Sequence, residues 1–246
     1  MDVILQGVVG STAYGLATPT SDIDRLGVYV APTEAILGLN GANAADNSIV
    51  RTEPDLTLHE VGKYLSLALK GNPTILELLY LEEYDVCGYR NPLVECRDQF
   101  LSKKLAKTYG GYVMQQVKRL ENRNAEGKAG FSSDLGKRTA KHGRHCYRLL
   151  TQGQQLLTEK RITIKLDEHQ RRACFDAGEL AERSPERFRE YIERKMELFD
   201  LAAEKSTLPD HPDYTATDWL LKSIRMDHWG YELPVPWSMH IGEDEE

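Results

Sequence analysis

The sequence predicts an α+β fold, in which a small sheet with flanking helices is followed by a mainly helical C-terminal region. Before Glu60 the chain contains short β-type runs separated by Gly, Pro, Ser and Thr, a pattern typical of strands joined by turns. From Glu60 onward, apolar residues recur with helical periodicity. Strands and helices do not alternate along the chain, so a Rossmann-type sheet is not expected.

Three strands are predicted, followed by a succession of helices. Val3–Val9 and Leu26–Val30 are the clearest β-type runs, and Leu56–Leu58 with its flanks is the third. An alternating run at Ile162–Leu166 favours one more short strand. The expected helices are Val61–Leu69, Thr74–Leu81, Asn91–Lys104, Leu105–Arg123, Ser133–Thr151, Glu168–Glu182, Pro185–Glu204 and Tyr214–Asp227.

The chain is expected to divide into two domains. Residues 1–124 are predicted to form the sheet-containing domain, and residues 131–241 a helical domain. Asn124–Gly130 (NAEGKAG) has the small and polar residues of a flexible connector. Residues 242–246 form an acidic tail that is expected to be disordered.

Composition limits the classes of function. The formal net charge is −7, so a general attraction to nucleic acid is not expected, and any polyanion site must be a local basic patch. A signal peptide is not expected, because Asp2 and Gln6 interrupt the apolar start, and no apolar run approaches the ~20 residues that cross a bilayer. The cysteines form no CxxC pair, which fits reduced thiols in a cytoplasmic protein; they are Cys87, Cys96, Cys146 and Cys174.

Asp22 and Asp24 are the first candidate site residues. In a strand, residues two apart project from one face, so both carboxylates are expected to point the same way while Ile23 turns into the core. Adjacent carboxylates repel, and each makes the other harder to ionise. Mg²⁺ relieves this cost, and it typically binds one or two carboxylates together with substrate phosphates. The pair therefore predicts a metal–nucleotide site, the alternative being a solvated strand end.

Gly10 and Ser11 supply the second half of this site. They follow an apolar strand and precede a short segment that is expected to be helical. A glycine there lets the backbone approach a ligand closely. The N–H groups at a helix start, together with the Ser11 hydroxyl, can hold phosphate oxygens. The spacing to Asp22 allows a short helix and a turn, so phosphates and carboxylates are expected to meet at one end of the sheet.

The Gly-Ser pair followed by Asp-x-Asp resembles the signature of DNA polymerase β superfamily nucleotidyltransferases. Within that superfamily, GSTAYGLATPTSDIDRLGVYVAP resembles the predicted nucleotidyltransferases associated with RNA repair. The resemblance continues at Asp55–Glu60, Leu67–Leu79 and Lys141–Leu150. It implies a small mixed sheet of nucleotidyltransferase type, Mg²⁺ (or Mn²⁺) as cofactor and an NTP as substrate.

The resemblance also implies a third carboxylate on a later strand, beside the first pair. Asp55 is the preferred candidate because it begins the alternating run Asp55-Leu56-Thr57-Leu58, and Glu53 and Glu60 are close alternatives. Asp often occupies such turn positions for local hydrogen bonding alone. Glu77 lies in an apolar helix and is interpreted as a helix-face residue, with a site role as the alternative.

The expected reaction is transfer of NMP from an NTP to an acceptor hydroxyl, with release of pyrophosphate. Asp22, Asp24 and Asp55 are the expected catalytic and metal-binding residues, and RNA, such as tRNA, is the expected acceptor. The sequence leaves two alternatives open. One is a toxin-like enzyme that modifies a protein or a small molecule, and the other is a nucleotide- or RNA-binding module without turnover.

A basic helix is the remaining strong signal. Lys137–Arg148 (KRTAKHGRHCYR) contains five Lys or Arg, two His and no acidic residue. Lys141, His145 and Arg148 share one helical stripe, which Lys137 continues, and this stripe suits a triphosphate or a nucleic-acid backbone. The resemblance supports a nucleotide-binding role for these three. A solvated basic face is the plainer alternative, and a zinc site is weaker still because its candidate ligands, His142, His145 and Cys146, share no face.

Two further groups have plain interpretations. Lys70 and Asn72 are expected to end a helix, with a nucleotide contact as the alternative. Trp219, Trp229 and Trp237 lie in an aromatic C-terminal segment, which is expected to be a packing patch rather than a platform for stacking bases.

Overall fold

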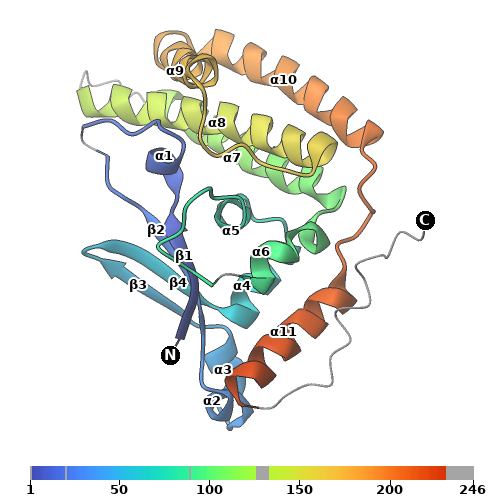
Figure 1. Ribbon diagram of the computed structural model, residues 1–246. Coiled ribbons are helices and arrows are strands. Elements are labelled where there is room, and N and C mark those ends of the chain that lie inside the picture. The colour runs from blue at the N-terminus through green and yellow to red at the C-terminus, as the bar shows by residue number, and fades with distance from the viewer. Residues whose placement is uncertain (1, 20, 89, 126–132, 231–246) are drawn as a thin grey trace.

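The structure of the protein is a computed structural model that describes residues 2–19, 21–88, 90–125 and 133–230. The predicted α+β class is confirmed: a mixed sheet with flanking helices lies in the N-terminal part, and long helices follow (Figure 1). Most of the predicted connector, the acidic tail and Trp237 lie outside the described residues.

The sheet has the strand order β3-β4-β2-β1-β5 within the described residues. Strands β1 and β2 are antiparallel, β2 and β4 are parallel, and β3 and β5 pair antiparallel at the two edges. The three predicted strands are present. The two edge strands are additions to the prediction, since they are short and largely exposed and carry no clear apolar pattern. The strands are β1 (Asp2–Val8), β2 (Arg25–Val30), β3 (Ser48–Thr52), β4 (Asp55–Glu60) and β5 (Val86–Cys87).

Short helices flank the sheet. The single helix predicted over Asn91–Lys104 is wrong, because two short helices end before Leu101, which is buried in an extended conformation. The helices α2 and α3 are also absent from the sequence prediction. The elements of this region are α1 (Gly10–Ala13), α2 (Thr33–Leu37), α3 (Gly41–Ala45), α4 (Val61–Leu69), α5 (Pro73–Leu78), α6 (Pro92–Glu95) and the 3₁₀ helix η1 (Arg97–Phe100).

Four long helices, α7 to α10, form the upper part of the molecule in Figure 1, and a fifth, α11, lies in its lower part. Helix α8 packs closely on α9, because a Cβ at Gly143 would lie 2.7 Å from the Ala181 side chain and one at Gly178 would lie 2.8 Å from the Ala140 carbonyl oxygen. This contact fixes the position of α8, which also borders the site. The long helices are α7 (Lys104–Ala125), α8 (Ser133–Glu159), α9 (Glu168–Arg183), α10 (Pro185–Lys205) and α11 (Tyr214–His228).

The strand predicted at Ile162–Leu166 is wrong. Ile162 and Ile164 are buried, so the alternation is real, but the segment pairs with no strand of the described sheet. The side chain of Gln155 takes the place of a partner strand: its Oε1 accepts from the Thr163 N–H, and its Nε2 donates to the Thr163 hydroxyl, both at 3.0 Å. The segment is therefore an ordered connector between α8 and α9.

Helix α11 returns to the sheet-containing part of the molecule, where it lies beside α4 (Figure 1). Its Leu220 and Ile224 belong to the same buried cluster as Leu5 of β1. Arg225 of α11 pairs with Glu60 at the end of β4 at 2.9 Å. The division into two domains stays a prediction, but the core is continuous across the two parts that it would separate.

None of the described helices is long and apolar enough to cross a membrane. The four cysteines are free thiols.

Candidate active site

Asp22 and Asp24 lie in the segment just before β2, not in the strand itself. The Val9 N–H donates to the Asp24 carbonyl oxygen at 2.9 Å, which extends the β1–β2 pairing by one step. The prediction that Ile23 turns into the core is wrong: its side chain is 49% exposed, because the strand alternation begins only after Asp24. Asp22 is exposed, and Asp24 is partly buried.

Parallel pairing of β2 and β4 brings Asp55 to the same end of the sheet as Asp24. Arg25 of β2 is opposite Leu56 of β4, and each aspartate immediately precedes its paired residue. Asp55 is exposed and is the first residue of β4. Strands that run parallel begin at one edge, so the two carboxylates meet there.

The raised pKa of Asp24 reflects its burial and its closeness to the other carboxylates. Burial raises the pKa of the Asp24 carboxyl, and the Asp55 and Asp22 carboxylates raise it further, with a side-chain hydrogen bond to Asp55 acting in the same direction. The ammonium group of Lys141 opposes this shift. Three carboxylates and one cation from α8 therefore interact at one point, although they are far apart in the sequence.

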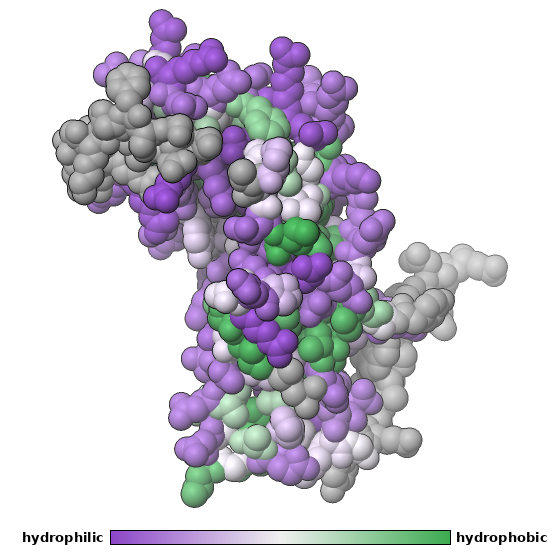
Figure 2. Space-filling view, turned by 90° about the vertical axis from the view of Figure 1, so that its left-hand side faces the viewer, coloured by the Kyte–Doolittle hydropathy of each residue, from purple (hydrophilic) through white to green (hydrophobic). Residues whose placement is uncertain are grey.

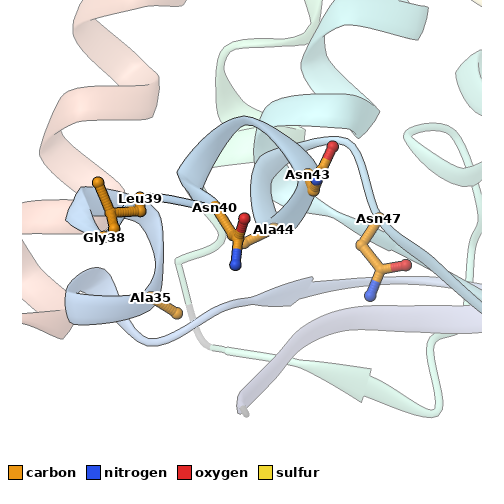
Figure 3. A pocket seen from close by; sticks show the side chains of 7 residues that line it. All are labelled: Ala35, Gly38, Leu39, Asn40, Asn43, Ala44 and Asn47. Atoms are coloured by element: carbon orange, nitrogen blue, oxygen red, sulfur yellow. The ribbon is translucent and has the colours of Figure 1, made fainter.

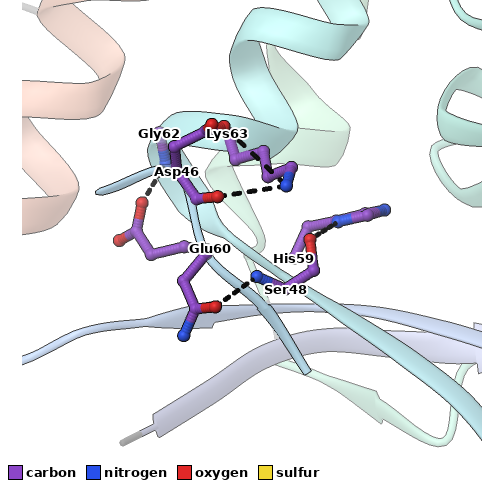
Figure 4. A network of polar contacts seen from close by, with 7 residues as sticks. Asp46, Ser48, His59, Glu60, Gly62 and Lys63 are labelled. Atoms are coloured by element: carbon purple, nitrogen blue, oxygen red, sulfur yellow. Dashed lines mark hydrogen bonds and ion pairs between the residues drawn. The ribbon is translucent and has the colours of Figure 1, made fainter. Parts of the chain in front are cut away.

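Glu60 does not belong to this group. It lies at the other end of β4, where it is fully buried and pairs with Arg225. One of its carboxylate oxygens also accepts from the Gly62 N–H at 2.6 Å, which caps α4 (Figure 4). The neighbouring pairs Ser48–His59 and Asp46–Lys63 surround the same end of the strand. Of the two alternatives for the third carboxylate, Glu60 is thus a structural residue, and Glu53 lies exposed in the turn between β3 and β4.

The Gly-Ser turn (Gly10–Ala13) lies directly against Asp24. A Cβ built on Gly10 would sit 2.7 Å from Asp24 Oδ2, and Gly10 has φ +67°, a conformation that favours glycine. The Leu16 N–H donates to the Ser11 carbonyl oxygen at 2.8 Å, so the chain folds back on itself after the turn. Gly10 and Ser11 are therefore beside the carboxylates, as the sequence predicts.

The donor types of Asp22, Asp24 and Asp55 suit a divalent cation, although these residues do not form a complete metal site by themselves. No group of three or more His, Cys, Asp or Glu side chains in the part of the chain that the structure describes is arranged to hold a metal ion. The donors nevertheless match the way in which Mg²⁺ binds, through one or two carboxylates plus substrate phosphates. Repulsion among the carboxylates, which raises the pKa of Asp24, is the kind of cost that a bound cation removes.

Comparison with known proteins decides the family. The RNA repair pathway DNA polymerase beta family matches residues 1–222, which is most of the chain. The chain belongs to this family. The description of this family names the DNA polymerase β type and an RNA repair pathway.

Individual relatives are distant. A protein of Enterobacteria phage T4, described as an uncharacterized 38.9 kDa protein in the nrdC-mobD intergenic region, is 26% identical over 129 residues. The aligned part is 48% of this chain and 38% of the phage protein, so the chain spans well under half of that relative. The crystal structure of a nucleotidyltransferase-like protein from Exiguobacterium sibiricum 255-15 matches with 13% identity and a TM-score of 0.28, over 99% of this chain and 79% of that protein.

The basic stripe of this polymerase β family member does not act as three equivalent cations. Lys141 is exposed and is the member that acts on Asp24. Burial, together with the nearby Arg148, His142 and Lys141, lowers the pKa of His145 to about 3, so its imidazole is neutral near pH 7. The side chain of Lys137 lies outside the described part of the chain.

Arg148 is turned into the protein. Its guanidinium forms an ion pair with Glu77 of α5 at 3.3 Å, and the two side chains are only 12% and 3% exposed. Burial by itself lowers the pKa of Arg148, but the Glu77 carboxylate, with smaller contributions from Tyr14, Cys174 and Tyr109, more than offsets this, so the pKa is raised. Glu77 is therefore not a surface helix-face residue. The nucleotide contacts predicted for His145 and Arg148 stay predictions.

The other candidates have structural partners. The His142 ring is hydrogen-bonded to Gln116 at 2.7 Å, and burial raises the pKa of the Cys146 thiol to about 12, so this pair offers no basis for a zinc site. Asn72 caps α5 by accepting from the Thr74 N–H at 3.1 Å, and Lys70 ends α4, as their plain interpretation predicts.

The aromatic C-terminal segment is not the expected packing patch within the described residues. Trp219 and Trp229 are 50% and 43% exposed, because they lie on the outer face and at the end of α11, whose buried face presents Leu220 and Ile224 instead.

Arg171 of α9 is a neighbour of the site that sequence reasoning does not reach. A Cβ at Gly15, just beyond the Gly-Ser turn, would lie 3.7 Å from Arg171 Cδ. Nothing in the sequence around Arg171 signals this contact, since it depends on how α9 packs on α8.

Hydrophilic residues dominate the upper, helical part of the face shown in Figure 2.

A separate hollow of ≈ 590 Å³ lies between α2 and α3 (Figure 3). Asn40, Asn43 and Asn47 line it together with small and apolar residues. The Asn47 carbonyl oxygen accepts from the Glu60 N–H at 3.1 Å, so the hollow lies at the Glu60 end of β4. It is therefore at the opposite end of that strand from the aspartates.

Proposed function

We propose that this nucleotidyltransferase transfers NMP from an NTP to a hydroxyl group of RNA, with Asp22, Asp24 and Asp55 binding Mg²⁺ or Mn²⁺. The observation that carries the proposal is the position of Asp24. It interacts with the carboxylates of Asp22 and Asp55 and with Lys141, and it touches Gly10 of the turn suited to phosphate. A pure binding module has no need for carboxylates gathered at such a turn.

Each residue has a stated task in this proposal. Bound metal ions would supply charge neutralisation for the triphosphate and for the leaving pyrophosphate. The Gly10 backbone permits close approach of the phosphates, and the Ser11 hydroxyl donates to a phosphate oxygen. The exposed Lys141 ammonium neutralises further phosphate charge from the α8 side. His145 completes the proposed nucleotide-binding set, and the buried Arg148, paired with Glu77, lies behind it.

Asp55 is the proposed acceptor of the proton. The acceptor oxygen forms a bond to the α-phosphorus while the bond from that phosphorus to the bridging oxygen breaks, and pyrophosphate leaves with the electron pair. The proton of the acceptor hydroxyl passes to the Asp55 carboxylate, which is exposed and free to meet a macromolecular acceptor. Positioning and charge neutralisation supply most of the rate in this class of reaction.

RNA is proposed as the acceptor because the family description names an RNA repair pathway. The test incubates the protein with each labelled NTP, Mg²⁺ or Mn²⁺, and a pool of RNA, DNA and protein. Label in RNA supports the proposal, whereas label on protein alone indicates a modifying enzyme.

Variants then assign the label to this site. Asp24→Asn and Asp55→Asn should remove transfer. The matched control is Asp46→Asn, since Asp46 is an exposed aspartate near the opposite end of β4 and should be dispensable. Loss of transfer in the control as well would show that the aspartates are not specific to the reaction.

A further inference from the structure

A buried polar cluster lies behind the Gly-Ser turn, between α1, α5 and α8. Its centre is the ion pair of Glu77 and Arg148. The guanidinium carbon of Arg148 is 4.1 Å from the centroid of the Tyr14 ring, a cation–π contact. Gln152, one turn further along α8, donates a hydrogen bond to the Tyr14 hydroxyl, and Tyr14 is fully buried.

Tyr14 connects this cluster to the candidate site. It directly follows α1, and its N–H donates to the Gly10 carbonyl oxygen at 3.3 Å. Gly10 in turn lies against Asp24. A continuous series of contacts therefore leads from Glu77 through Arg148 and Tyr14 to the turn and its carboxylate.

The same face of α8 touches the site at a second point. Lys141 precedes Arg148 by seven residues, or about two helical turns, and therefore lies on the same side of the helix. Lys141 acts on Asp24 from the solvent side, while Arg148 and Gln152 hold Tyr14 from the buried side. Helix α8 therefore holds both the Lys141 ammonium and the side chains that support Tyr14, so it sets the position of Lys141 relative to the Gly-Ser turn.

Stability alone is a poor explanation of this cluster. Replacing a buried ion pair by apolar side chains is often neutral or favourable, because burial of two charges is costly. The buried Tyr109 hydroxyl and Gln152 Oε1 add to the cost, since neither has a hydrogen-bond partner within the described residues. Polar groups kept at such a cost in contact with a candidate site indicate a role in that site.

We propose that Tyr14, Glu77 and Arg148 form a buried strut that positions the Gly-Ser turn beside Asp24. Arg148 is then a positioning residue that acts through Tyr14, rather than a residue that touches the nucleotide. The inference rests on the proposed function for its kinetic consequence, but the strut itself is a property of the fold. It assigns Glu77 and Tyr14 a role that their sequence context does not indicate.

A double-mutant cycle distinguishes positioning from direct contact. Glu77→Gln, Arg148→Met and the double variant are compared by KM for the NTP and by kcat. With a strut, either single change displaces the turn and raises KM by about tenfold or more, since a displacement of about 1 Å can cost up to about 100-fold. The double variant is no worse than the single ones, because both act on one element. A normal KM in Glu77→Gln, with loss only in Arg148→Met, would overturn the strut in favour of direct contact.

The other buried Glu–Arg pair is a matched control. Glu60 and Arg225 are 2.9 Å apart, with side chains 0% and 13% exposed, at the far end of β4. Glu60→Gln and Arg225→Met leave a buried charge unpaired in the same way, but their contacts do not reach the turn. They should leave the KM for the NTP at the wild-type value. An equal rise in KM would show that KM follows general stability, and the strut would be rejected.

Hydrogen exchange tests the strut without any activity. Amide exchange of residues 10–16 should be faster in Glu77→Gln than in Glu60→Gln, and unchanged exchange there would overturn the proposal. If the wild type transfers no label but exchange responds as expected, the proposed function fails and the strut stands. If Glu77→Gln does not fold, the apolar pair Glu77→Met with Arg148→Met takes its place, and wild-type exchange and KM in that variant would reject the strut.

Discussion

Gly10 lies so close to Asp24 that a Cβ on the glycine would be 2.7 Å from Asp24 Oδ2. Real Cβ atoms do not approach an oxygen of a fixed side chain so closely, so the two residues are in direct contact. The phosphate-facing turn and the carboxylate therefore form one unit, whose geometry depends on the absence of a side chain at residue 10.

Gly10→Ala should consequently damage activity more than stability. The added methyl group pushes Asp24 away from the other carboxylates, and the positive φ of residue 10 is unfavourable for alanine by about 1–2 kcal/mol. We expect loss of most transfer activity in a folded protein, measured by labelled NTP transfer and by urea unfolding. Gly111→Ala is the control, because nothing lies within 4 Å of the methyl group that alanine would add there in helix α7, and alanine favours a helix. Full activity in Gly10→Ala would show that the contact has no catalytic importance.

Asp24→Asn should stabilise the metal-free protein at neutral pH. The pKa of Asp24 is raised in the folded state, so between the unfolded and folded values the native protein binds more protons than the unfolded chain. Stability therefore falls as pH rises through the folded-state pKa, and it is lowest where Asp24 is fully ionised. Asparagine removes this dependence.

Urea midpoints measured with EDTA at several pH values from neutral to acid check this. As the pH falls, the urea midpoint of the wild type should rise relative to that of the variant. Mg²⁺ at neutral pH should raise the midpoint of the wild type but not that of the variant. A variant that is less stable than the wild type in EDTA at neutral pH would mean that Asp24 is a structural residue.

The sequence predicts the site better than it predicts the surroundings of the site. Asp22, Asp24, Gly10 and Ser11 are close in the chain, and the antiparallel pairing of β1 with β2 brings the turn after β1 beside the segment before β2. Asp55 is reached only through the family resemblance, which implies a carboxylate on a later strand, and the parallel pairing of β2 with β4 then shows why it lies at the same edge. The burial predicted for Ile23 is wrong because period-2 alternation does not reveal where a strand starts. Strand β2 begins only at Arg25.

Contacts between distant elements are what the sequence leaves out. The helical stripe of α8 can be read from its spacing, but the partner of Arg148 is Glu77, from a helix whose apolar context gives no sign of a buried acid with a cationic partner. The return of α11 to Glu60 is hidden for the same reason. Periodicity reports which face of a helix is buried and not what it is buried against.

His145→Gln should make the protein less sensitive to acid. The folded-state pKa of His145 is about 3, well below its ordinary value of 6.5, so the unfolded chain binds more protons between those values. Wild-type stability should fall as pH drops from about 6.5, and by pH 5 this residue alone accounts for about 1–2 kcal/mol. Urea unfolding at pH 7.5 and pH 5 should show a smaller drop in His145→Gln. The exposed His169→Gln is the control, and an equal drop in all three proteins would refute the assignment.

Arg225→Met should destabilise the protein strongly. The Glu60 side chain is 0% exposed, and Arg225 is its cationic partner at 2.9 Å. Removing one member of a buried pair leaves the other charge unpaired, which typically costs about 3–5 kcal/mol. Arg189→Met, which breaks an exposed pair with Glu193, should cause no measurable change. If denaturant unfolding shows the two variants to be equally stable, α11 is not held on the sheet by this pair, and the apolar contacts of Leu220 and Ile224 carry its packing alone.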